Sequence, residues 1–194
     1  VYACKERQDH IQWRQMVDLT ILKTDLYEVT HLQKTDLPML ASFETKPEGR
    51  GLQFYLQKHA YRDEINGSSR TYLVKDVMSG ELVSYFTLRT GLVTVSRGLF
   101  KGFDAKTGIE LANFAINERY RNANEVIPRL GSYVFERFII PIVMQIREGI
   151  GAEYLYIYAL PNDKLMAHYE TMGFSKATKS VERCVYRHVK PVYD

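Results

Sequence analysis

The sequence predicts a single α/β domain with a mixed, mostly antiparallel central sheet flanked by helices. Three observations support this fold class. Residues 71–88 have the pattern of a β-hairpin, residues 109–160 have the pattern strand, helix, strand, and residues 163–189 add a further helix and strand. A strand–helix–strand unit places two strands parallel and side by side, joined by a right-handed crossover.

The elements are expected in the following chain order. Residues 1–194 are expected to form one domain, because this length and 45% hydrophobic residues suffice for one core. Within it, residues 1–34 carry a weak secondary-structure signal and are expected to be an N-terminal extension of uncertain structure. Helices are expected near residues 36–41 and at 51–62, and hairpin strands at 71–76 and 82–88. Residues 91–108 are expected to be irregular because of their glycines. A strand at 109–116, an apolar helix at 129–147, a buried strand at 154–160, a helix at 163–172 and a strand at 181–189 complete the domain.

Composition restricts the function. The net charge of +3 is mildly basic, which is weak support for nucleic-acid binding. The longest uncharged apolar run, residues 138–144, is too short to span a bilayer, and no signal peptide is visible, so we expect a cytoplasmic protein without a membrane partner. Cys4 and Cys184 are expected to be free thiols, and the histidines lack metal-ligand spacing, so no metal is expected.

The junction between the strand at 109–116 and the helix at 129–147 is the first candidate site. A helix that begins after a loop presents unpaired N–H groups and the positive end of its dipole, which suits a phosphate. Gly131 lets a ligand approach the backbone, and Arg121 and Arg129 add positive charge. The alternative is an ordinary crossover whose glycine only eases packing. From this stretch alone, that alternative is the more common case.

The helix at 163–172 is the second candidate. Asn162 or Asp163 can cap it, and Gly173 can end it. Met166 and Tyr169 lie three residues apart and share a face. Taken alone, Tyr169 is more often a core aromatic than a functional residue.

Together the two segments resemble the GNAT acetyltransferases. The resemblance rests on Phe114-Ala115-Ile116, Tyr120-Arg121, the helix start Leu130-Gly131-Ser132, and Asn162, Tyr169 and Gly173-Phe174. It covers residues 71–174 and implies a GNAT-like fold, acetyl-CoA as cosubstrate, and transfer of an acetyl group directly to a primary amine. It further implies that the backbone of Phe114, Ala115 and Ile116 binds pantetheine, that Arg129, Leu130, Gly131 and Ser132 hold the pyrophosphate, that Asn162 lies near the cofactor, and that Tyr169 protonates the departing thiolate.

The loop before the helix departs from the family pattern. In the family, the last glycine of the loop follows the aromatic residue by six positions, whereas Gly131 follows Tyr120 by eleven, so about five residues are inserted. Pro128-Arg129 replaces other expected glycines. The pyrophosphate site is therefore either reshaped, with Arg129 compensating for lost backbone contacts, or weakened.

The resemblance fixes neither the general base nor the acceptor. Glu110 lies on the strand beside the expected cleft and is our candidate base, although a solvated carboxylate is an equally good interpretation. We expect a small-molecule, peptide or tRNA-borne amine as the acceptor, and a homodimer is left open. Residues 68–72 and 150–152 resemble acetyltransferase toxins of toxin–antitoxin pairs, which acetylate aminoacyl-tRNA. A non-catalytic acyl-CoA-binding domain is the remaining alternative, because a fold does not fix an activity.

Overall fold

The computed structural model describes residues 22–96, 102–159, 163–176 and 184–188. The strands are β1 (Tyr27–His31), β2 (Arg70–Asp76), β3 (Leu82–Ser96), β4 (Phe103–Ile116), β5 (Tyr154–Tyr158), β6 (Ser175–Lys176) and β7 (Cys184–His188). The α-helices are α1 (Leu37–Leu40), α2 (Arg50–Lys58), α3 (Ala60–Asn66), α4 (Glu118–Ala123), α5 (Leu130–Val134), α6 (Ile140–Ile150) and α7 (Asp163–Thr171), with short 3-10 turns η2 (Lys34–Asp36) and η3 (Pro47–Gly49) and a π-helical segment η4 (Phe135–Ile139).

The described strands form one sheet in the order β1-β2-β3-β4-β5-β7-β6. Neighbouring strands are antiparallel except β4 and β5, which are parallel. The predicted mixed, mostly antiparallel sheet with a parallel strand–helix–strand unit is thereby confirmed. Part of the expected N-terminal extension is strand β1, which pairs with β2 at the edge of the sheet.

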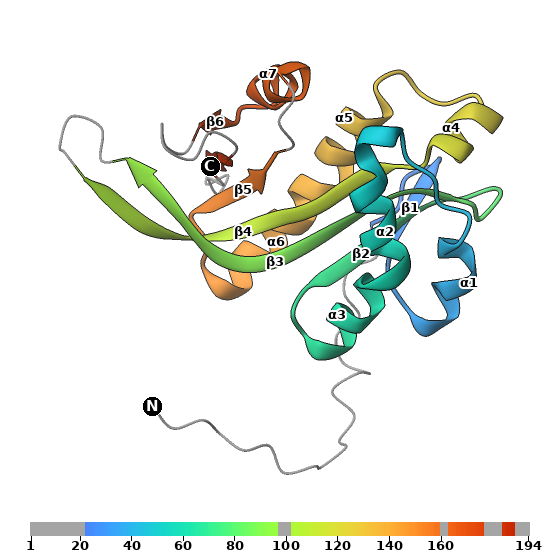
Figure 1. Ribbon diagram of the computed structural model, residues 1–194, viewed down its shortest axis with the longest axis horizontal. Helices are drawn as coiled ribbons and strands as arrows, with labels where there is room; N and C mark the ends of the chain where they lie inside the picture. The colour runs from blue at the N-terminus through green and yellow to red at the C-terminus, as the bar shows by residue number, and fades with distance from the viewer. Residues whose placement is uncertain (1–21, 97–101, 160–162, 177–183, 189–194) are drawn as a thin grey trace, which may run out of the picture.

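Helices cover the two faces of the sheet (Figure 1). The helices α1, α2 and α3 lie on one face, and the run α5-η4-α6 lies on the other. Alternate residues of a strand point to opposite faces. Accordingly Leu73 and Tyr85 pack with Leu56 of α2, whereas Val74 and Phe86 belong to the core around Phe135 and Phe138. None of the helices in the described ranges is long and apolar enough to cross a bilayer.

The expectation of irregular chain over residues 91–108 is wrong. The strands β3 and β4 continue through this region as a long hairpin that pairs as far as Ser96 and Phe103 and projects beyond the helices (Figure 1). The glycines were interpreted as strand breakers, but Gly91 and Gly108 are cross-strand partners. Both lie against the ring of Tyr156, where a side chain would not fit.

The predicted helix at 129–147 is a continuous helical run from Leu130 to Ile150 that contains the π-helical segment η4. Pro141 explains the interruption. Proline has no N–H, so it cannot donate the α-helical bond to the carbonyl four residues earlier. A local change to π-helical bonding accommodates this loss without ending the helix.

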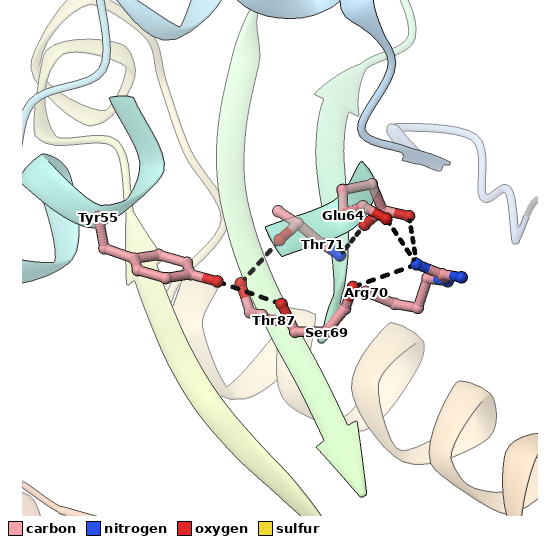
Figure 2. Close-up of polar contacts among 6 residues, drawn as sticks. All are labelled: Tyr55, Glu64, Ser69, Arg70, Thr71 and Thr87. Atoms are coloured by element: carbon pink, nitrogen blue, oxygen red, sulfur yellow. Dashed lines mark hydrogen bonds and ion pairs between the residues drawn. The ribbon is translucent and has the colours of Figure 1, made fainter. Parts of the chain in front are cut away.

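A network of polar side chains holds α2 and α3 on the sheet (Figure 2). It consists of Tyr55, Glu64, Ser69, Arg70, Thr71 and Thr87. The Tyr55 hydroxyl lies 3.2 Å from Ser69 Oγ, and Thr71 Oγ1 lies 3.0 Å from Thr87 Oγ1. The Thr71 N–H donates to Glu64 Oε2 at 2.8 Å. The toxin-like motif at residues 68–72 therefore contributes anchoring contacts between the helices and β2.

Candidate active site

A cleft opens where β4 and β5 separate. The two strands pair only from Gly108 with Tyr154 to Glu110 with Tyr156, whereas β4 continues to Ile116. The resulting cleft has a volume of about 280 Å³. Its lining comes from β4, β5, α7, α4 and the segment around η3, namely Thr45, Lys46, Gly49, Leu52, Leu111, Ala112, Asn113, Phe114, Ala115, Ile116, Glu118, Arg121, Ile157, Tyr158, Ala159, Leu165 and Tyr169.

The wall formed by β4 contains Phe114, Ala115 and Ile116, the residues predicted to bind pantetheine. On the other side of β4, the pairing with β3 continues to Ser84 and Ile116, with a shift of register that leaves Ala112 unmatched. Backbone N–H and C=O groups require hydrogen-bond partners. Because the pairing with β5 stops at Glu110, the edge of β4 that faces the cleft can supply such groups to an extended ligand.

Tyr169 lines the cleft from α7 and is buried, with 8% of its surface exposed. Its ring also packs against Phe174 in an edge contact, with centroids 5.6 Å apart. Tyr169 is therefore both a core aromatic and a residue of the cleft, so its packing role does not exclude a functional one. Burial raises the pKa of the Tyr169 hydroxyl to about 12, so the group carries its proton at neutral pH.

The start of α5 lies beside the cleft but does not line it. The first bond of the helix runs from the Tyr133 N–H to the Arg129 carbonyl, so the N–H groups of Leu130, Gly131 and Ser132 lie at its open end. A Cβ built on Gly131 would meet only the Ile116 side chain, at 4.0 Å. The packing explanation for this glycine is thus unsupported.

Arg129 precedes α5 with φ at 55° and ψ at 44°, in the left-handed region. Among the described residues it is the sole non-glycine with a positive φ. Glycine adopts this conformation without steric cost, whereas other residues are strained by it. Arg129 therefore occupies a backbone position suited to glycine while presenting an exposed cation near the helix terminus.

The residues inserted between Tyr120 and Gly131 are accommodated by α4 and the loop after it. Tyr120 is buried and donates a hydrogen bond to Asp76 Oδ2 at 2.5 Å, which fixes α4 to the end of β2. Arg121 lines the cleft, and its guanidinium forms an ion pair with Glu118 at 2.8 Å; its role in cofactor binding stays a prediction.

Asn117 is a structural residue that the sequence analysis missed. Its Oδ1 accepts hydrogen bonds from the backbone N–H groups of Glu44 and Arg119, both at 3.2 Å, and its Nδ2 donates to the Leu82 carbonyl at 2.7 Å. It thereby joins the end of β4, the N-terminus of α4 and the segment that leads to Thr45 and Lys46 in the cleft wall. An Asn directly before a helix is a capping signal that would have identified it.

Glu110 and Asn162 differ from the other predicted site residues. Glu110 is buried beneath the point where β4 and β5 separate, and both of its oxygens accept hydrogen bonds from Arg89 or Tyr156. It is absent from the cleft lining, and its role as a base stays a prediction. Asn162 lies outside the described residues. Within the described ranges, no group of three or more His, Cys, Asp or Glu residues is arranged to hold a metal ion.

The strand order, the separation of β4 from β5 and the cleft between them give the chain a GNAT-like fold, as the sequence predicted. Among solved structures, the chain is similar to AtaTR bound with acetyl-CoA, with 18% identity, 86% of this chain and 95% of the other covered, and a TM-score of 0.64. It is also similar to a tyrosine-to-phenylalanine mutant of KacT (15% identity, coverage 84% and 95%, TM-score 0.67) and to AtaT complexed with acetyl-methionyl-tRNAfMet (17% identity, coverage 84% and 94%, TM-score 0.66). Neither a family model nor a curated protein sequence matches the chain.

Proposed function

We propose that this chain is an N-acetyltransferase that transfers an acetyl group from acetyl-CoA directly to a primary amine. One observation carries the proposal: the free edge of β4 and the hydroxyl-bearing Tyr169 line the same cleft. The similarity in fold to AtaTR bound with acetyl-CoA supports the choice of cosubstrate.

The cosubstrate is proposed to lie along β4 with its phosphates toward α5. The backbone of Phe114, Ala115 and Ile116 pairs with the pantetheine arm, since β5 leaves this edge open. The N–H groups of Leu130, Gly131 and Ser132 and the positive end of the helix dipole receive the pyrophosphate. Arg129 adds positive charge, whereas the charge of Arg121 is balanced in part by Glu118, which lines the same cleft. Arg121 and Asn162 remain proposed to lie near the cofactor.

The reaction requires one proton donor and no covalent enzyme intermediate. The amine nitrogen forms a bond to the thioester carbonyl carbon, and the carbon–sulfur bond breaks. The nitrogen loses one proton to solvent water, and solvent returns a proton to the Tyr169 oxygen after it has donated its own. A backbone N–H on the cleft edge of β4 stabilises the charge that develops on the carbonyl oxygen. Tyr169 donates its proton to the departing thiolate, which its raised pKa permits at neutral pH.

Mass spectrometry of the purified chain mixed with acetyl-CoA and a panel of amines tests the proposal. The panel contains small polyamines, peptides with free N-termini and aminoacyl-tRNA. Acetylation of any member above the rate without enzyme supports an acetyltransferase. Binding of acetyl-CoA without turnover on any amine would favour the non-catalytic acyl-CoA-binding alternative.

The amine of aminoacyl-tRNA is a second candidate acceptor. The observation in its favour is the similarity in fold to AtaT complexed with acetyl-methionyl-tRNAfMet. The net charge of +3 is modest for such a partner. Binding of charged tRNA should weaken steeply as salt is raised, because phosphate contacts release counterions. Unimpaired growth on induction, together with unmodified charged tRNA, would exclude this acceptor.

A further inference from the structure

Three polar side chains from three neighbouring strands meet at the base of the cleft. Arg89 of β3 lies opposite Glu110 of β4 in the strand register, and Glu110 lies opposite Tyr156 of β5. The Arg89 guanidinium donates from Nη2 to Glu110 Oε1 at 2.8 Å and from Nε to Oε2 at 3.0 Å. The Tyr156 hydroxyl donates to the same Oε2 at 3.1 Å.

The sequence provides the space that this arrangement needs. A Cβ on Gly91 would meet the Tyr156 hydroxyl oxygen at 2.1 Å, and a Cβ on Gly108 would meet the ring at 2.9 Å. Contacts below 3.0 Å between such atoms require a displacement. The Tyr156 ring can therefore lie flat enough over β3 and β4 to reach Glu110 only because both cross-strand partners are glycines.

The position of the cluster coincides with the end of the parallel pairing. Glu110 and Tyr156 are the last paired residues of β4 and β5. The next residues on both strands, beginning with Leu111 and Ile157, line the cleft. Tyr158, which also lines the cleft, packs edge-on against Tyr156 with ring centroids 5.9 Å apart.

We propose that Arg89, Glu110 and Tyr156 form a positioning cluster that fixes where β4 and β5 separate, and thereby where the acyl thioester lies. This inference rests on the proposed function and assigns Glu110 a role other than general base. The bidentate pair with Arg89 and the bond from Tyr156 use three of the roughly four lone-pair sites of the carboxylate, and Glu110 is absent from the cleft lining. Both facts favour a positioning role over that of a base that receives a substrate proton.

The test uses two conservative variants and one control in the full chain. Tyr156→Phe removes only the hydroxyl, and Glu110→Gln removes the charge while keeping the shape. The control is Glu153→Gln, because Glu153 pairs with Lys106 across the same β4–β5 edge but is exposed and lies at the opposite end of the pairing. Hydrogen exchange of the amides at residues 108–110 and 154–156, the paired parts of β4 and β5, reports on the separation of the strands without any ligand. Both cluster variants should exchange faster there, and the control should not.

Ligand affinity supplies the second readout. In the proposed binding mode the acetyl end of acetyl-CoA lies at the base of the cleft, whereas 3′,5′-ADP contains only the nucleotide end of the cosubstrate. Both cluster variants should lose about 10-fold or more in affinity for acetyl-CoA and keep their affinity for 3′,5′-ADP, since a small displacement at the reacting end has a large effect. With an amine that the wild type acetylates, both single variants should lower kcat/KM by similar factors. The double variant should lower kcat/KM by less than the product of those two factors, because both substitutions disrupt the same cluster.

Unchanged exchange at residues 108–110 and 154–156 would overturn the proposal. An equal loss of affinity for both ligands, or global unfolding of both variants, would also overturn it, because either result would give the cluster a general structural role. Abolished turnover in Glu110→Gln alone, with Tyr156→Phe fully active, would restore Glu110 as the base. Failure of the wild type to bind acetyl-CoA would count against the proposed function, while the exchange measurement would still decide the role of the cluster.

Discussion

Tyr156 lies so close to Gly91 that a Cβ on the glycine would meet the tyrosine hydroxyl oxygen at 2.1 Å. Gly91→Ala should therefore displace the ring and break its bond to Glu110. Overpacking of this kind costs about 1–3 kcal/mol, so we expect the free energy of unfolding in urea to fall by that amount.

Gly51→Ala is the matched control for this substitution. Gly51 lies in α2, and nothing lies within 4 Å of a Cβ built there. Alanine is favoured over glycine inside a helix by up to about 1 kcal/mol, so this variant should be more stable than the wild type. If the two substitutions changed the free energy of unfolding equally, the Tyr156 side chain would have moved away from the new methyl group at little cost.

Tyr169→Phe separates an enzyme from a binding domain. The substitution keeps the ring that packs on Phe174 and removes the proton donor. General-acid catalysis is worth about 10²- to 10⁴-fold, so kcat should fall by that factor while the dissociation constant of CoA changes little. Tyr61→Phe on α3 is the control and should retain turnover. A fully active Tyr169→Phe would leave Tyr169 as a core aromatic only.

The strained backbone of Arg129 makes a second pair of variants informative. Arg129→Gly relieves a φ of 55° and should raise the free energy of unfolding by about 1 kcal/mol, whereas Arg129→Ala keeps the strain. Both remove the cation, so both should weaken CoA more than they weaken pantetheine, which lacks the pyrophosphate. Isothermal titration with the two ligands measures this difference. Equal losses for both ligands would mean that Arg129 does not contact the phosphates.

His31 predicts a pH dependence of stability. Burial, with a smaller effect from the Arg70 charge, lowers the pKa of His31 to about 4 from its ordinary 6.5. Both ring nitrogens are buried without a hydrogen-bond partner among the described residues. Folding therefore favours the neutral ring. The contribution of the neutral ring to the free energy of unfolding is complete above pH 6.5 and is lost as the pH falls from 6.5 through 4.

Urea unfolding midpoints of the wild type and of His31→Phe, measured between pH 7.5 and pH 4, isolate this effect. The other titratable groups are the same in both proteins, so the difference between the two curves reports on His31. His31→Phe keeps an aromatic ring against Tyr72 and cannot be protonated. The wild type should lose more stability than this variant over the interval. Parallel curves would show that His31 titrates in the folded state as it does in the unfolded chain.

The local pattern of the sequence determined most of the elements near the cleft. Alternating β-forming residues predicted β2 and the first part of β3, and the apolar helix and buried strand after residue 109 predicted the parallel pair that opens the cleft. The resemblance to the GNAT acetyltransferases implied which segments meet, and the structure brings Ile116 and Tyr169 into one cleft. The individual strands and helices depend on residues close in sequence, which is why pattern alone reveals them. The acceptor amine and a homodimer stay predictions.

Only the tertiary structure decided what Gly91, Gly108 and Glu110 do. In sequence, a glycine indicates a break and a lone carboxylate next to a cleft indicates a base. In the folded chain, Tyr156 from a strand more than forty residues away covers both glycines and donates to Glu110, while Arg89 from β3 binds the same carboxylate. The role of each residue is set by contacts between strands distant in sequence, and the register that creates those contacts exists only once the whole sheet has formed.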